Sequence, residues 1–298
     1  MNTITRTALK ELLESPHPPL LIDITPAEYF HAAHLPGARN CCVYEVNFVD
    51  QAAAIAPDKS ASIVVYGSSA HSLASSTAAE KLEKAGCTHV LNYRGGLEDW
   101  VEAGFPVERG PQPPEEKPRE GRRDIDIAQS RVLWTGRNAG SAHSGAVSVA
   151  SGWLDVLPGP AASGEFTLDM DSIADTDIPD STLARVLNAH LKSDDFFDTA
   201  RYPTATFQLR HVTFNCHGRP GSINADVDGA LTLKGITAEL AFPALIQALP
   251  GGALSAEAHF DIDRTRWNVI YGSGKFYEKL GKHLVYDNIS LSLRIVTR

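Results

Sequence analysis

Residues 223–234 read Ile223-Asn224-Ala225-Asp226-Val227-Asp228-Gly229-Ala230-Leu231-Thr232-Leu233-Lys234, with apolar and polar side chains alternating along almost the whole run. Successive side chains of a β-strand point to opposite faces, so this period of two predicts a strand with one apolar and one polar face. The same alternation recurs at residues 131–137, 166–171, 205–210, 254–263 and 289–295. We therefore expect an antiparallel sheet from Asp124 onward, with its apolar face buried.

About eight such strands with little helix favour a closed antiparallel β-barrel, because closure removes the exposed edges of the sheet. A barrel of this size is either filled by side chains or holds one apolar ligand. Small residues recur on the inward faces and leave room for a ligand: Ala205, Ala225, Gly229, Ala256 and Ala258. The alternative is that these small residues face bulky partners, which would fill the barrel, and the alternation alone leaves both interpretations open.

Candidate ligand-binding residues follow from the parity of the strands and from one short helix. Asp180-Ser181 begins a helix that places Leu183, Val186, Leu187 and Leu191 on one face, where it would plug one mouth of the barrel. The full candidate set comprises the inward aromatic residues and the residues of this helix and its end: Trp134, Phe166, Leu187, Leu191, Phe196, Phe197, Phe207, Phe260 and Trp267. His143 and His190 have no metal-ligating neighbours at suitable sequence spacing, so no metal site is expected.

The first part of the chain has a different pattern, in which short apolar runs alternate with helical periodicity. Strands are expected at Leu20–Ile22, Ser62–Tyr66 and His89–Asn92. Helices are expected over Thr5–Glu14, over His71–Ala85 with a stop at Gly86, and from Gly95-Gly96 to Ala103 with a stop at Gly104. Strands that alternate with helices predict an α/β domain with a mostly parallel sheet.

A segment rich in proline and charge separates the two patterns. Arg109–Gly121 contains four prolines and alternating charges, which is typical of an extended linker. We therefore predict an α/β domain at residues 1–108, a linker at 109–123 and a β-barrel domain at 124–298.

Composition excludes several classes of protein. The 298 residues carry a net charge of −9 without a basic stripe, so nucleic acid is not an expected partner. No apolar run approaches the roughly 18 residues of a membrane helix, and the first residues lack the apolar core of a signal peptide. A cytoplasmic location is therefore expected. The cysteines form no C-x-x-C pair and are expected to be reduced and mostly buried.

The first domain resembles the rhodanese family. Its matching segments are Leu21-Ile22-Asp23 with Pro26-Ala27-Glu28-Tyr29-Phe30, His34-Leu35-Pro36-Gly37-Ala38, and Gly95-Gly96-Leu97-Glu98-Asp99-Trp100. The resemblance implies that the loop after Tyr66 begins with the sulfur-carrying cysteine, but this chain has Gly67 there, and Thr25 stands where the family usually has arginine. Glycine has no side chain to act as a nucleophile or to carry sulfur. The resemblance therefore implies a rhodanese fold without rhodanese chemistry.

Two other parts of the first domain offer groups in place of the missing thiol: the rest of this loop and the cysteine pair at 41–42. The remaining loop residues are Ser68, Ser69, Ala70, His71 and Ser72. Hydrolase chemistry needs a serine with a positioned base and an orienting acid, which His71 alone does not supply, whereas a capped helix start explains the same residues. Cys41 or Cys42 is the alternative sulfur acceptor, although Cys41-Cys42-Val43 is also typical of a strand.

The second domain resembles the YceI-like family from Asp124 to Arg298. The matching segments are Ala189–Asp198 with Arg201–Phe207, Gly229–Thr237 and Asp263–Gly274. The resemblance implies a lipocalin-like barrel that holds a long apolar, isoprenoid-type or amphiphilic ligand. Many members of the family are periplasmic, whereas this sequence shows no export signal.

Together these observations predict a non-catalytic binding protein rather than an enzyme. The expected ligand is an isoprenoid, a quinone or a fatty-acyl compound in the barrel, and no catalytic cofactor is expected. The first domain would be an inactive docking or regulatory module that contacts a second copy of the chain or another protein. Two alternatives remain open: sulfur transfer through Cys41 or Cys42, and a structural interaction protein with a filled barrel.

Overall fold

The computed structural model describes residues 2–110, 120–156, 162–215 and 221–298. The chain divides into two compact units, Met1–Glu115 and Glu116–Arg298. The predicted linker at 109–123 lies largely outside the described residues. Within the described part of the chain, no helix combines the length and the apolar character that crossing a membrane requires.

The first unit is built on a parallel sheet, as the sequence predicted. Its strands run in the order β1-β5-β4-β2-β3 and every pairing between them is parallel. The strands are β1 (Asn2–Thr3), β2 (Leu20–Asp23), β3 (Arg39–Asn40), β4 (Ser62–Tyr66) and β5 (His89–Tyr93). The helices are α1 (Arg6–Leu13), α2 (Ala27–Ala32), α3 (Phe48–Ile55), α4 (Ala74–Lys84) and α5 (Gly96–Glu102).

Both faces of this sheet are covered by apolar packing, as is usual for parallel sheets. Ile63 and Val65 of β4 pack in one cluster with Phe48 of α3 and residues of α4. Val64 and Tyr66, which alternate with them, pack in a second cluster with Leu9 of α1 and Trp100 of α5. The alternation of neighbouring residues between two clusters explains why this strand is apolar throughout rather than at every second position.

Two local expectations in this unit differ from the structure. The helix expected from His71 begins at Ala74, because the preceding residues form a turn in which the Ser72 amide donates to the Ser69 carbonyl at 3.2 Å. Cys41-Cys42-Val43 is not a strand, since β3 ends at Asn40. The predicted helix ends are confirmed at Gly86 and Gly104, whose positive φ values of 95° and 73° favour glycine.

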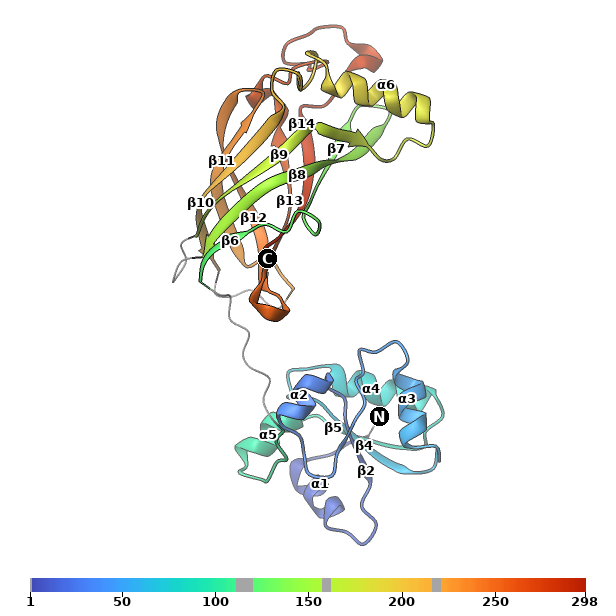
Figure 1. Cartoon of the computed structure of the whole chain (residues 1–298). Helices are drawn as coiled ribbons and strands as arrows, with labels where there is room; N and C mark the ends of the chain where they lie inside the picture. The colour runs from blue at the N-terminus through green and yellow to red at the C-terminus, as the bar shows by residue number, and fades with distance from the viewer. Residues whose placement is uncertain (1, 111–119, 157–161, 216–220) are drawn as a thin grey trace. The chain divides into compact units, whose positions relative to one another are not determined.

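The second unit is an antiparallel barrel. The strand order is β6-β8-β7-β14-β13-β12-β11-β10-β9, and an additional pairing of β8 with β9 closes the eight described strands β7–β14 into a barrel (Figure 1). The strands are β6 (Gly121–Asp124), β7 (Arg131–Arg137), β8 (Ala142–Val156), β9 (Ala162–Asp175), β10 (Thr204–Phe214), β11 (Ala225–Leu233), β12 (Ile236–Ala248), β13 (Leu254–Asp263) and β14 (Asn288–Val296). The predicted antiparallel eight-stranded barrel is therefore confirmed.

The long strands β8 and β9 provide the closure. Their register shifts between Ala146 and Ser148 and again between Val149 and Ser151, and such bulges bend a strand and increase its twist. Strand β6 pairs with the second half of β8, at Trp153–Val156. Residues 121–123, which the sequence assigned to the linker, are therefore part of the barrel sheet.

The predicted mouth helix is α6 (Ser181–Lys192), which lies across one end of the barrel (Figure 1). Its first turn is capped by Asp180, whose carboxylate accepts hydrogen bonds from the amides of Thr182 and Leu183 at 2.7 and 3.1 Å. The side-chain oxygen of Asn188 on α6 accepts a hydrogen bond of 2.7 Å from the amide of Asp175 at the end of β9. This bond ties the helix to the rim of the barrel.

Candidate ligand-binding cavity

The barrel encloses a cavity of about 710 Å³, lined by the inward faces of strands β7–β14 and by residues of α6 and its C-terminal loop. This volume lies within the range of roughly 300–1,000 Å³ that is typical of small-molecule sites. The lining is mostly aliphatic and aromatic. The inward positions predicted by parity on β7, β9, β10 and β14 line this cavity.

Four phenylalanines on β9, β10, β12 and β13 form an aromatic wall. Phe207 lies between Phe166 and Phe242, with ring centroids 6.3 and 5.7 Å away. Phe260 stacks on Phe242 at 4.2 Å with the rings nearly parallel. This wall continues around the barrel across β9, β10, β12 and β13, so an apolar chain in the cavity has aromatic contact over several strands.

The end of the cavity near α6 is closed by the helix and the loop that follows it. Leu187, Leu191, Phe196 and Phe197 all line the cavity. His190 contacts the rings of Phe196 and Tyr271 edge-on, with centroids 4.9 and 4.7 Å away. Leu183 and Val186, which the periodicity placed on the same face, are 59% and 63% exposed, so only the C-terminal half of the apolar face is used.

Polar lining residues gather at the connection of β7 with β8. Arg137, Asn138, Ser141 and His143 come from this region, and β8 there pairs with the end of β9, which is tied to α6. Deeper in the wall, the indole N–H of Trp134 is buried and has no hydrogen-bond acceptor among the described residues. The cavity is therefore apolar along its length, with polar groups concentrated at the rim near α6.

Trp267 is buried in the core of the second unit, but it does not line the cavity. It lies in a short 3₁₀ turn, Arg264–Trp267, so the period of two ends before it is reached. Its side chain is fully buried, and its indole nitrogen donates a hydrogen bond of 2.8 Å to the carbonyl of Leu231.

The remaining eight candidates in the set line the cavity. Phe242 and Tyr271 were missed, although alternation along Leu240, Phe242 and Ala244 of β12 carries the signal for the first.

The loop after β4 is held against α5. The carbonyls of Gly67 and Ser68 accept hydrogen bonds of 2.9 Å from the amides of Leu97 and Glu98. The Ser72 hydroxyl accepts from the Ala74 amide at 3.2 Å, in keeping with a local role at the start of α4. Within the described chain, His71 is exposed and no hydrogen bond joins it to Ser68, Ser69 or Ser72. The loop thus lacks the base–nucleophile contact that acyl transfer requires.

The two neighbouring cysteines differ in accessibility. Cys41 is 1% exposed and its thiol donates to the carbonyl of Phe48 at 3.6 Å. Burial, together with the nearby Cys42, raises the pKa of the Cys41 thiol to about 11. Cys42 is partly exposed. Since the thiolate is the reactive form, Cys41 is a poor nucleophile at neutral pH.

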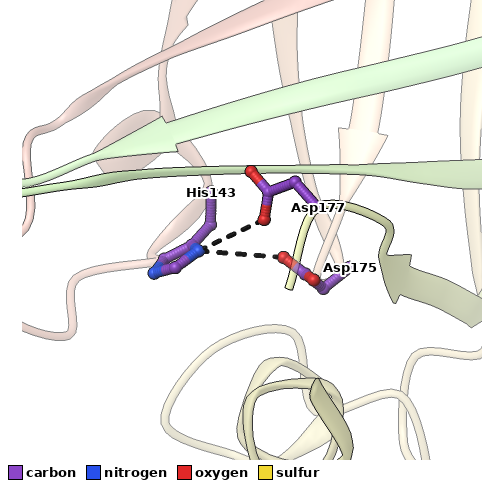
Figure 2. A group of neighbouring side chains, drawn as sticks. All are labelled: His143, Asp175 and Asp177. Atoms are coloured by element: carbon purple, nitrogen blue, oxygen red, sulfur yellow. Dashed lines mark hydrogen bonds and ion pairs between the residues drawn. The ribbon is translucent and has the colours of Figure 1, made fainter. Parts of the chain in front are cut away.

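The structure brings together three possible metal ligands that their spacing in the sequence does not reveal. His143 on β8 lies beside Asp175, the last residue of β9, and Asp177, so that one nitrogen and two carboxylate oxygens lie within 4.8 Å of one another (Figure 2). More than 30 residues separate the histidine from either aspartate. Only the pairing of β8 with β9 brings them together.

The fold and the cavity define a two-domain chain in which a parallel α/β domain precedes a closed barrel with an apolar interior. Residues 124–297 match the family model of the YceI-like domain, and residues 5–103 match that of the rhodanese-like domain. The chain therefore belongs to the YceI-like domain family and carries a rhodanese-like domain before the barrel. No curated protein matches the sequence significantly.

Several solved structures are similar to one or the other domain. BcnA from Burkholderia cenocepacia is 24% identical with a TM-score of 0.45, and the match covers 58% of this chain and 99% of BcnA. A polyisoprenoid-binding domain from Saccharophagus degradans, implicated in plant cell wall breakdown, is 15% identical with a TM-score of 0.45, covering 60% and 99%. The Alr3790 protein from Anabaena is 30% identical with a TM-score of 0.32, covering 36% and 93%.

Proposed function

We propose that the barrel binds a long apolar or amphiphilic molecule of the isoprenoid, quinone or fatty-acyl type, and that the rhodanese-like domain is a non-catalytic docking module. The cavity of about 710 Å³ carries the first part of this proposal. An apolar chain that enters it leaves water, which is favourable by about 0.8 kcal/mol for each buried methylene group. Useful affinity therefore requires no catalytic group.

The distribution of polar groups supports an amphiphile. A molecule with one polar end would place its chain along the aromatic wall and its head near His143, Asn138 and Arg137 at the rim. These features favour a ligand-filled barrel over a barrel filled by its own side chains.

The docking role of the first domain is supported by what its loop lacks. Position 67, where the rhodanese resemblance implies the sulfur-carrying cysteine, is glycine. The buried thiol of Cys41, with its raised pKa, is a poor replacement. The domain nevertheless keeps a complete apolar core on both faces of its sheet. A folded domain without a nucleophile is suited to binding a partner.

The test of ligand binding is to measure the native mass of the freshly purified full chain and to identify what organic solvent extracts from it. We expect an isoprenoid, quinone or fatty-acyl species at about one per chain. The described lining begins at Glu120, so a chain that starts there should retain the same species if the first domain has no part in ligand binding. A full chain that is empty and takes up no isoprenoid or fatty-acyl probe would contradict the proposal.

The sulfur-transfer alternative leads to a prediction about thiol reactivity. At pH 8, an alkylating reagent should modify Cys41 about 100-fold more slowly than a reference peptide thiol added to the same sample, since a pKa raised from 9.0 to about 11 leaves about that much less thiolate. Residue-resolved mass spectrometry measures both rates in one sample, and the difference should vanish in denaturant. Cyanolysis activity that is lost in Cys41→Ser would contradict the non-catalytic role.

A further inference from the structure

His143, Asp175 and Asp177 face one another, and the hydrogen bond between His143 and Asp177 is long. The Nδ1 atom of His143 lies 3.4 Å from Oδ1 of Asp177 and 3.9 Å from Oδ2 of Asp175 (Figure 2). Ordinary hydrogen bonds between nitrogen and oxygen are about 2.7–3.2 Å long. Two ligand atoms bound at about 2.1 Å to one tetrahedral ion lie about 3.4 Å apart, which is close to the observed spacing.

Each carboxylate has one oxygen fixed by the backbone and the other directed to the histidine. Oδ1 of Asp175 accepts from the Ile178 amide at 2.8 Å, and Oδ2 of Asp177 accepts from the Ser144 amide at 2.8 Å. The remaining oxygens are those that face His143. Hydrogen bonds that orient ligating carboxylates in this way are characteristic of metal sites.

Asp175 provides the independent observation that a ligand is missing. Its side chain is 0% exposed, and its Oδ2 atom has no hydrogen-bond partner among the described residues. A buried carboxylate oxygen without a partner is costly, and a second carboxylate nearby increases the cost through repulsion. A cation between the two aspartates and the histidine would remove both penalties.

The donor set selects the class of ion. Imidazole nitrogen suits Zn²⁺ and neighbouring transition metals, whereas Ca²⁺ and Mg²⁺ prefer oxygen ligands alone. The side chains of His143 and Asp177 are 40% and 39% exposed, so an ion can enter from solvent. His143 also lines the cavity, which places the cluster at its rim.

We propose that His143, Asp175 and Asp177 bind one divalent transition-metal ion, with Zn²⁺ the best match, at the rim of the barrel cavity. Three protein ligands leave at least one coordination position for water or for an anionic group. The site is built from β8 and the end of β9, and it does not depend on whether the cavity contains a ligand.

The experiment uses the tag-free full chain, treated with chelator and extracted of lipid, so that a failure here says nothing about the cavity. Titration with Zn²⁺ is followed by calorimetry, and titration with Co²⁺ by visible absorption. We expect one ion per chain at this site. Asp175→Asn and His143→Gln should each weaken the binding at least tenfold and abolish the rise in melting temperature that Zn²⁺ causes.

Asp228→Asn is the matched control, because Asp228 is an exposed aspartate on β11, outside the cluster, and should bind Zn²⁺ as the wild type does. Asp175→Asn should not lower the melting temperature of the metal-free protein, because it removes a buried charge whose Oδ2 atom has no hydrogen-bond partner among the described residues, while the Asn side-chain oxygen can still accept from the Ile178 amide. An unchanged melting temperature would show that the lost binding is not lost folding. Zn²⁺ affinities that are equal in the wild type, Asp175→Asn and His143→Gln would overturn the proposal.

Discussion

Leu291→Trp should weaken the binding of an isoprenoid or fatty-acyl probe by about 60-fold. Leu291 lines the cavity on β14, between Trp134 on β7 and Phe260 on β13 in the register of the sheet. An indole at this position occupies space that the ligand chain would use. If it excludes about three methylene groups, the loss is about 2.4 kcal/mol, which corresponds to that factor. Fluorescence titration of a long-chain probe measures the change in Kd.

Leu133→Trp is the matched control for this prediction. Leu133 is 45% exposed on β7, on the face opposite to Trp134, and pairs with Ser292, the neighbour of Leu291. The same substitution on the outer surface should leave the Kd within a factor of two. If both variants bind the probe like the wild type, the ligand does not occupy the middle of the barrel. Equal losses in both would point to a general disturbance of the fold.

Gly145→Ala should lower the free energy of unfolding of the barrel by about 3 kcal/mol. A Cβ atom at Gly145 would lie 2.6 Å from Cε2 of Trp134 and closer still to the carbonyl oxygen of Ala174. The second neighbour is backbone in a paired strand, so it cannot move without breaking the pairing of β8 with β9 that closes the barrel. Overpacking of this kind costs about 1–3 kcal/mol, and the rigid neighbour places this site at the upper end.

Gly136→Ala on the neighbouring strand is the control. A Cβ there would meet nothing closer than Cδ1 of Ile289 at 3.7 Å, an ordinary van der Waals contact. Urea unfolding followed by tryptophan fluorescence should separate the two variants, with Gly136→Ala within about 1 kcal/mol of the wild type. A stable Gly145→Ala would contradict the close packing of Trp134 on β8.

Strand patterns and turn residues were predictable because their causes are local. Alternation along β11 and β14 depends only on which side of a strand each residue faces, so parity placed Val227, Leu231 and Leu291 on the inner face before any pairing was known. Gly86 and Gly104 follow the ends of helices because the backbone there takes a positive φ, which glycine adopts without steric cost. Parity along β13 does not extend to Trp267, which lies in the 3₁₀ turn after the strand and packs in the core without lining the cavity.

The sequence by itself determined the two domain types, the inward faces of the barrel strands, the capped helix at Asp180 and the absence of a cysteine at position 67. Tertiary structure alone decided that the barrel encloses an open cavity, which Ala205 and Ala256 line, whereas Gly229 packs against the ring of Phe207. It also decided that Cys41 is buried and that His143 meets Asp175 and Asp177. The physical reason is the sequence separation over which each feature is set. The periodicity of a strand and the caps of a helix depend on residues close together along the chain. The volume of the cavity, the burial of the Cys41 thiol and the meeting of distant side chains depend on how segments far apart in the sequence pack together.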